Sequence, residues 1–100
     1  MKYNLIKSSI FSRKASKLIK SHPELINIFK QKLMDLSENP FTNNLRTHKL
    51  KGQLSDSWAC SLTYEYRIIL KIIDSYKLEN EQMINNVIFL ETIGTHDEVY

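Results

Sequence analysis

The chain has 100 residues, of which 42% are hydrophobic and 25% charged, and its formal net charge is +3. This size and composition suit a single folded domain over residues 1–100 and exclude a disordered chain, because there are enough apolar residues to build a core. No apolar stretch approaches the roughly 20 residues that a membrane span needs. Residues 1–7 show no signal-peptide pattern, so we expect a cytoplasmic protein. Cys60 is the only cysteine, which excludes an internal disulfide and a cysteine-rich zinc site.

The charge is distributed unevenly along the chain. Residues 1–51 hold eleven Lys and Arg against three acids, a net +8, whereas residues 52–100 hold three against eight, a net −5. A basic half of this kind suits a surface that faces a polyanion, because phosphate contacts from Lys and Arg dominate non-specific affinity for nucleic acids. A solvated lysine-rich helix would explain the same charge, so the charge alone leaves both interpretations open.

The first half of the chain predicts a short strand followed by two helices. Residues 3–7 can form the strand, and apolar residues recur at helical spacing from Ser9 onward. Ser21 and Glu24 have the spacing of a capping box that begins the second helix, and the Asn-Pro pair at 39–40 ends it. The two predicted buried stripes are Phe11, Ala15, Leu18 and Ile19 in the first helix, and Leu25, Ile28, Phe29, Leu33 and Leu36 in the second.

The second half of the chain predicts strands. Alternation is clearest at residues 66–73, where the even-numbered side chains share one face. Residues 45–51, 58–63 and 87–93 are further strands, and the polar stretch 74–86 is expected to be a long loop. No helix lies between these strands to carry a parallel crossover. The predicted class is therefore α+β, with an N-terminal helical hairpin packed on a small antiparallel β-sheet.

The segment after the last predicted strand holds the first candidates for chemistry. His96 and Tyr100 lie four residues apart and follow Gly94, which we interpret as the turn that ends the strand. An imidazole at the mouth of a buried strand is held on a rigid base near solvent, and it can give or take a proton near neutral pH. The alternative is a frayed C-terminus whose polar residues have no role.

Two upstream residues favour a functional interpretation of this segment. Arg67 interrupts the apolar run of strand 66–73, where a guanidinium must reach solvent, pair with an acid such as Glu65 or Glu91, or bind an anion such as phosphate. His48 is flanked by cations, which favour the neutral imidazole that acts as a base; an inert surface histidine is the alternative. Three histidines without a carboxylate cluster do not suggest a metal site, and we expect no cofactor.

The succession of these features resembles the RelE/ParE superfamily of bacterial toxins, and within it the RelE, YoeB and YafQ-like messenger-RNA endonucleases of type II toxin–antitoxin modules. The resemblance covers nearly the whole chain, although the helical half is similar in pattern only. The segments that carry it are His48-Lys-Leu-Lys-Gly, Trp58, Tyr66-Arg67-Ile-Ile-Leu, Ile93-Gly94-Thr95-His96 and the terminal Glu98-Val99-Tyr100.

The resemblance implies catalytic roles for four residues and a reaction. Arg67 falls where the family binds the scissile phosphate, His96 at a catalytic histidine, His48 at the candidate general base, and Tyr100 at a C-terminal aromatic that stacks on or orients the substrate. The implied reaction is metal-free, ribosome-dependent cleavage of mRNA by attack of the ribose 2′-OH on the adjacent phosphate. The implied contacts to RNA and the ribosome are Arg13, Lys14, Lys17, Lys20, Arg46, Lys49 and Lys51.

The resemblance also implies a cognate antitoxin as partner, operator DNA bound only through the toxin–antitoxin complex, and no membrane partner. The chain departs from the YafQ-like pattern at Ser61, where a histidine is usual, at Glu65-Tyr66 in place of Asp-Trp, and at Thr92 in place of arginine. Two alternatives stay open. One is a ParE-like toxin on the same fold that inhibits DNA gyrase by binding, and the other is a decayed homologue that only binds an antitoxin.

Overall fold

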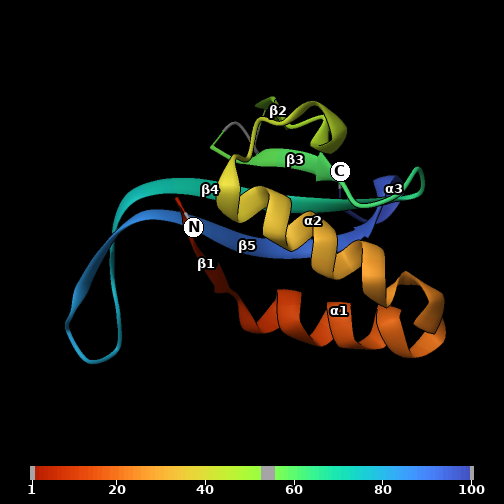
Figure 1. Ribbon diagram of the computed structural model, residues 1–100, viewed down its shortest axis with the longest axis horizontal. Helices are drawn as coiled ribbons and strands as arrows, with labels where there is room; N and C mark the ends of the chain where they lie inside the picture. Colours follow the sequence, from red (N-terminus) through yellow and green to blue (C-terminus); the bar gives the residue numbers. More distant parts are fainter. Residues whose placement is uncertain (1, 53–55, 100) are drawn as a thin grey trace.

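The computed structural model describes residues 2–52 and 56–99. The strands in these two ranges form one sheet in the order β1-β5-β4-β3-β2, and two helices cover one of its faces (Figure 1). None of the described helices is long and apolar enough to cross a membrane. In chain order the elements are β1 (Asn4–Lys7), α1 (Ser9–Ser21), the 3-10 turn η1 (Pro23–Leu25), α2 (Ile26–Glu38), the 3-10 turn η2 (Asn43–Leu45), β2 (His48–Lys49), β3 (Trp58–Ser61), β4 (Tyr66–Lys77), β5 (Met83–Thr95) and α3 (His96–Val99).

One apolar core holds α1 and α2 against the sheet. Phe11 of α1 and Leu36 of α2 are fully buried, and the rings of Phe11 and Phe29 stack with centroids 6.1 Å apart. Burial of each such side chain contributes roughly 1.5–3 kcal/mol. The predicted stripes are confirmed at these positions, but Ile28 is 40% exposed and was wrongly placed in the core. The sheet supplies Cys60, Ile68, Leu70, Ile88, Leu90 and Ile93 to the same core.

The sheet is mixed, so the expectation of purely antiparallel pairing was wrong. β1 runs parallel to β5, with Asn4 opposite Val87 and Lys7 opposite Leu90. The paired strands that follow one another in the chain are antiparallel, but β1 and β5 are the first and last strands. Here the whole chain between the first strand and the last forms the crossover, and the parallel pairing makes β5 a central strand with β1 on one side and β4 on the other.

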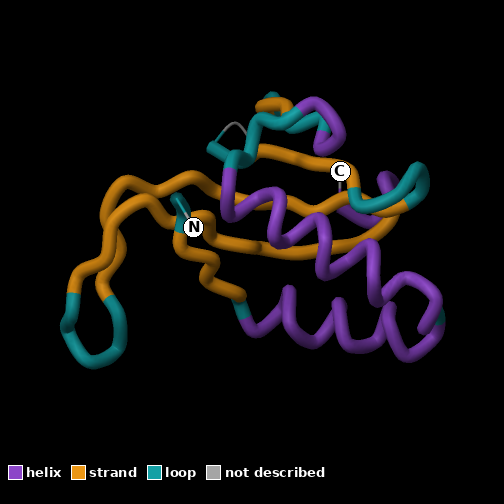
Figure 2. Tube along the Cα trace, viewed as in Figure 1, coloured by secondary structure: helices purple, strands orange, loops and turns teal. Residues whose placement is uncertain are grey.

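The polar stretch 74–86 is mostly paired strand, which corrects its prediction as a loop. The antiparallel register continues from Ser75 opposite Asn85 to Lys77 opposite Met83, and only residues 78–82 form the tip. The arm extends beyond the rest of the sheet in Figures 1 and 2. Because both faces of a two-stranded arm meet solvent, polar residues suit it, and their polarity concealed the strand period from the sequence argument.

The junction between the helices is also built differently from its prediction. Ser21 ends α1 instead of capping α2, and Pro23–Leu25 forms a 3-10 turn whose first flanking residue, His22, makes no side-chain capping bond. Glu24 lies 3.5 Å from Nδ1 of His22 instead of reaching back to Ser21. The end of α2 at Glu38, directly before the Asn-Pro pair, is confirmed.

Ser8 joins α1 to the sheet, because its Oγ accepts a hydrogen bond from the Phe11 N–H at 2.9 Å and donates one to the Glu91 carbonyl at 2.7 Å. We expect Ser8→Ala to lower the free energy of unfolding by about 1–2 kcal/mol, since both groups lose a partner. Urea denaturation followed by circular dichroism measures this change. Ser16→Ala, at an exposed site of the same helix, is the control and should change stability by less than about 0.5 kcal/mol. Equal losses in the two variants would contradict the role of Ser8.

Candidate active site

The sheet register places His48 and Arg67 on the face that points away from α1 and α2. Residues directly opposite one another in an antiparallel pair share a face. His48 pairs with Ala59, which pairs with Ile69, two residues along β4 from Arg67. Ile68, between them, belongs to the core under the helices, so Arg67 and Ile69 lie on the other face.

Two strand spacings, across β3, and two residues along β4 separate His48 from Arg67. A strand spacing of ~4.8 Å and a rise of ~3.4 Å per residue put the Cα atoms of His48 and Arg67 about 12 Å apart. The two side chains share one face of the sheet, and Nη1 of Arg67 is bonded to main-chain carbonyls of the turn between β3 and β4. The register therefore brings a candidate base and a candidate cation to one face, and whether they meet at one phosphate group is part of the proposal made below.

Arg67 is half-buried, and part of its guanidinium stabilises the turn between β3 and β4. Its Nη1 donates to three main-chain carbonyls: Thr63 at 2.8 Å, Tyr64 at 2.8 Å and Tyr66 at 3.2 Å. Glu91, one of the acids that the sequence offered as a partner, instead accepts a hydrogen bond from Ser57 Oγ at 2.5 Å. The three bonds use only Nη1, so they do not engage the Nε–Nη2 edge, which has the geometry for a bidentate bond to phosphate.

His48 is exposed on β2, and its Nδ1 lies 3.0 Å from the carbonyl oxygen of Arg46. Because a carbonyl only accepts, the hydrogen belongs on Nδ1, and Nε2 is then the basic nitrogen of the neutral ring. Arg46 has a left-handed backbone, with φ of 52°. The tautomer that this contact favours is the one that a general base at Nε2 requires.

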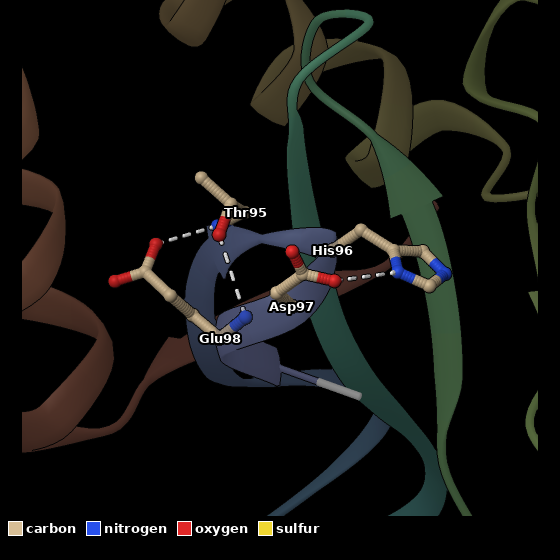
Figure 3. Close-up of polar contacts among 4 residues, drawn as sticks. All are labelled: Thr95, His96, Asp97 and Glu98. Carbon is tan, nitrogen blue, oxygen red and sulfur yellow. Dashed lines mark hydrogen bonds and ion pairs between the residues drawn. The ribbon is translucent and has the colours of Figure 1, made fainter.

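His96 begins α3 directly after β5, and its side chain is 64% exposed. Its Nδ1 lies 3.7 Å from Oδ1 of Asp97 (Figure 3). β5 pairs with β4 up to Thr95, which is opposite Tyr66, so His96 follows at the end of the sheet where Arg67 lies. Tyr100, the fourth predicted catalytic residue, lies outside the described residues.

Gly94 is a strand residue opposite Arg67 and does not form the turn that the sequence predicted. Its lack of a side chain matters for a different reason. A Cβ at this position would lie 3.1 Å from Cγ1 of Val99 and 3.2 Å from Cβ of Glu98, closer than usual contacts. Glycine therefore allows α3 to fold back against the strand that precedes it.

α3 is closed by a pair of reciprocal hydrogen bonds that the sequence argument missed. The Thr95 N–H donates to Oε1 of Glu98 at 2.8 Å, and the Glu98 N–H donates to Oγ1 of Thr95 at 3.4 Å (Figure 3). This is a capping box, and its Thr-x-x-Glu spacing is visible in the sequence. The hydrogen bond from the Thr95 main chain is the first cause that lowers the pKa of Glu98 below its ordinary value.

The basic residues predicted to contact RNA fall into two groups. Those of α1 lie at the helix-covered side, where Lys14 and Lys17 line a cleft of about 260 Å³ together with Glu98. Those near β2 are exposed, and Nζ of Lys49 lies 5.9 Å from the centroid of the Trp58 ring. The members of the first group are Arg13, Lys14, Lys17 and Lys20, and those of the second are Arg46, Lys49 and Lys51.

Cys60 is fully buried, which confirms its prediction as a core residue. Burial raises the pKa of its thiol to about 12, although Lys32 and Arg67 oppose the shift. A thiol held neutral in this way is a poor nucleophile. Within residues 2–52 and 56–99, no three His, Cys, Asp or Glu side chains are grouped so that they could hold a metal ion.

No family model matches the chain, and no curated protein matches it in sequence. Solved structures do match over its whole length. YafQ from E. coli strain BL21(DE3) has a TM-score of 0.74 at 18% identity, covering 98% of both chains. The E. coli DinJ–YafQ toxin–antitoxin complex gives 0.73 at 18%, covering 100% of this chain and 99% of the other. The YoeB/ParE toxin from Agrobacterium tumefaciens gives 0.70 at 13%, covering 93% and 98%.

These matches identify the fold as that of the RelE/ParE toxins, which confirms the resemblance seen in the sequence at the level of fold. The chain is an α+β protein with two N-terminal helices on a five-stranded mixed sheet.

The raised pKa of Cys60 predicts a specific dependence of stability on pH. The unfolded thiol ionises from about pH 8.5 and the folded one only near 12. The stability that the neutral buried thiol contributes is therefore complete below about pH 8.5 and is lost as the pH rises toward 12. Between pH 8 and 10, the free energy of unfolding should fall by roughly 1–2 kcal/mol more in the native chain than in Cys60→Ala. Identical pH profiles of the two proteins in urea denaturation would contradict this.

Proposed function

We propose that this chain is the toxin of a type II toxin–antitoxin module and a ribosome-dependent endoribonuclease that cleaves mRNA without a metal ion. The observation that carries the proposal is the sheet register. It puts His48 and Arg67 on one face and places His96 two residues after Gly94, the strand partner of Arg67. The fold shared with YafQ and with a YoeB/ParE toxin supports the same class of activity.

The proposed reaction needs one base, one cation and one acid. Nε2 of His48 takes the proton of the ribose 2′-OH, and the 2′-oxygen attacks the adjacent phosphorus. The Nε–Nη2 edge of Arg67 binds the phosphoryl oxygens, where negative charge grows. Protonated His96 gives its proton to the departing 5′-oxygen. The products are a 2′,3′-cyclic phosphate and a 5′-hydroxyl, and Tyr100 is proposed to stack on or orient the substrate.

The proposed partners follow from the same class. The ribosome presents the message, and the exposed cations Arg46, Lys49 and Lys51 lie in or beside the edge strand β2, where they are able to bind RNA phosphates. Lys49 pairs with Trp58 and so extends from the face opposite to that of His48. A cognate antitoxin is proposed because a protein of this fold, YafQ, has been solved in a toxin–antitoxin complex. Operator DNA would be bound only through such a complex, and the cytoplasm is the compartment in which these partners meet.

One observation favours the alternative of a toxin that acts by binding, as on DNA gyrase, or of a decayed homologue. The three carbonyl bonds of Arg67 give this arginine a structural role without any substrate. Thr92, which stands in place of an arginine, has a buried Oγ1 that finds no hydrogen-bond partner among the described residues. The chain thus has threonine at position 92, where the resemblance would place a second arginine, and variants of Arg67 and His96 decide between the alternatives.

Expression of the chain should arrest growth, and Arg67→Ala or His96→Ala should relieve the arrest. Loss of one transition-state donor or acid costs about 100- to 1000-fold in rate. Cleavage is measured in an in vitro translation reaction with the message ends mapped. Because Arg67 also stabilises a turn, circular dichroism must show that each variant is folded. Lys77→Ala, an exposed charge on the β4–β5 arm, is the matched control and should stay toxic. Toxicity that survives both site changes, with intact messages and damaged DNA, would favour the gyrase alternative.

The nucleophile is tested by the substrate instead of the protein. A message with a single 2′-O-methyl ribose at a mapped cleavage position should not be cut there, because the attacking hydroxyl is blocked. Cleavage at unmodified positions of the same message is the internal control. Cutting at the modified position would show that water is the nucleophile, and His48 would then have a different role.

A further inference from the structure

We propose that Glu98 is a positioning residue for His96: by closing the capping box with Thr95 and facing α1, it holds α3 in the orientation that turns the imidazole away from α1, to the side of the sheet on which Arg67 lies. The proposal rests on the proposed function for the role of His96 as the acid. The orientation itself is a property of the fold and is tested separately from activity.

A helix as short as α3 needs fixed ends. It contains four residues, and so few residues do not form a stable helix by intrinsic propensity. The two hydrogen bonds between Thr95 and Glu98 satisfy two N–H groups at the start of α3. Thr95 is itself held in the β4–β5 ladder, opposite Tyr66. The first turn of α3 is therefore fixed to the rigid strand by the side chain of Glu98.

The side to which the Glu98 side chain points determines the side to which the His96 side chain points. The two residues are two positions apart, which is about 200° around a helix of 3.6 residues per turn. In Figure 3 their side chains extend to opposite sides of α3. Glu98 lines the cleft on the α1 side, so His96 is turned away from α1. A rotation of α3 that released Glu98 would therefore also move the imidazole.

Two lysines of α1 stabilise this orientation. Lys14 and Lys17 line the same cleft of about 260 Å³ as Glu98. They are among the causes that lower the pKa of its carboxyl, after the hydrogen bonds from Thr95. Gly94 leaves room for the Glu98 carboxylate in this position, because a Cβ at residue 94 would lie only 3.2 Å from Oε1 of Glu98. Lys14 and Lys17 therefore face an anion within their own chain, which gives them a role other than the RNA contact that the sequence suggested.

The direct test observes the His96 ring in the full-length protein. Histidine ring signals are recorded by NMR at one fixed pH, and the His96 signal is assigned by its loss in His96→Asn. Glu98→Ala should shift this signal and speed amide hydrogen exchange of residues 96–99 by at least about 10-fold, because the first turn loses its cap. Glu98→Gln should restore part of both, since its carbonyl oxygen still accepts from the Thr95 N–H. Glu79→Ala, an exposed acid at the arm tip, is the control. An unchanged His96 signal in Glu98→Ala would overturn the proposal.

The kinetic test separates positioning from RNA binding. Lys17→Ala should lower kcat and leave KM unchanged, and the effect should disappear in a Glu98→Ala background, because the lysine acts through the carboxylate. A raised KM with unchanged kcat, persisting in that background, would assign Lys17 to RNA and overturn its anchoring role. If Glu98→Ala shifts the His96 signal but RNA cleavage is unaffected, the positioning of His96 stands and its role as the acid in the proposed function is wrong.

Discussion

The antiparallel pairing of β4 with β5 is the interaction on which the other features depend. It runs from Tyr66 opposite Thr95 to Lys77 opposite Met83, and both strands contribute apolar residues to the core under the helices. The same ladder sets Arg67 opposite Gly94 and delivers the chain to α3 at that end. A shift of one residue in this register would turn Arg67 into the core and move His96 along the sheet edge. The candidate site therefore depends on the packing of side chains on the opposite face.

The same short sequence motif predicted local structure correctly at one place in the chain and wrongly at another. The capping-box spacing occurs at Ser21 and Glu24, where no box forms, and at Thr95 and Glu98, where one does. At the first site the proline at position 23 begins a 3-10 turn, so the helix starts later and Glu24 lies near His22 instead. At the second site the strand ladder holds Thr95 in place, and the box closes. The same short motif thus needs a fixed neighbour before it determines structure.

The charge of the chain also gains meaning from its placement. A net charge of +8 in residues 1–51 suggested one polyanion-binding surface. The folded chain divides these cations between α1 and the region of β2, and two of the α1 lysines face Glu98 from the acidic half. Part of the charge asymmetry is therefore satisfied within the molecule, and the cations near β2 are those that the proposed function assigns to RNA.

Periodicity alone determined the elements with strong apolar patterns. Phe11, Leu36 and Ile68 are buried as their spacing predicted, and the α+β class follows from them, because apolar stripes must be covered wherever they occur. The parallel pairing of β1 and the strand character of 74–86 were decided only by tertiary structure, since pairing partners and polar ladders leave no local pattern. The sequence also identified His48, Arg67 and His96 as candidates by residue type. The shared face of His48 and Arg67, the carbonyl bonds of Arg67 and the orientation of His96 through Glu98 came from the tertiary structure, because each depends on contacts between segments far apart in the chain.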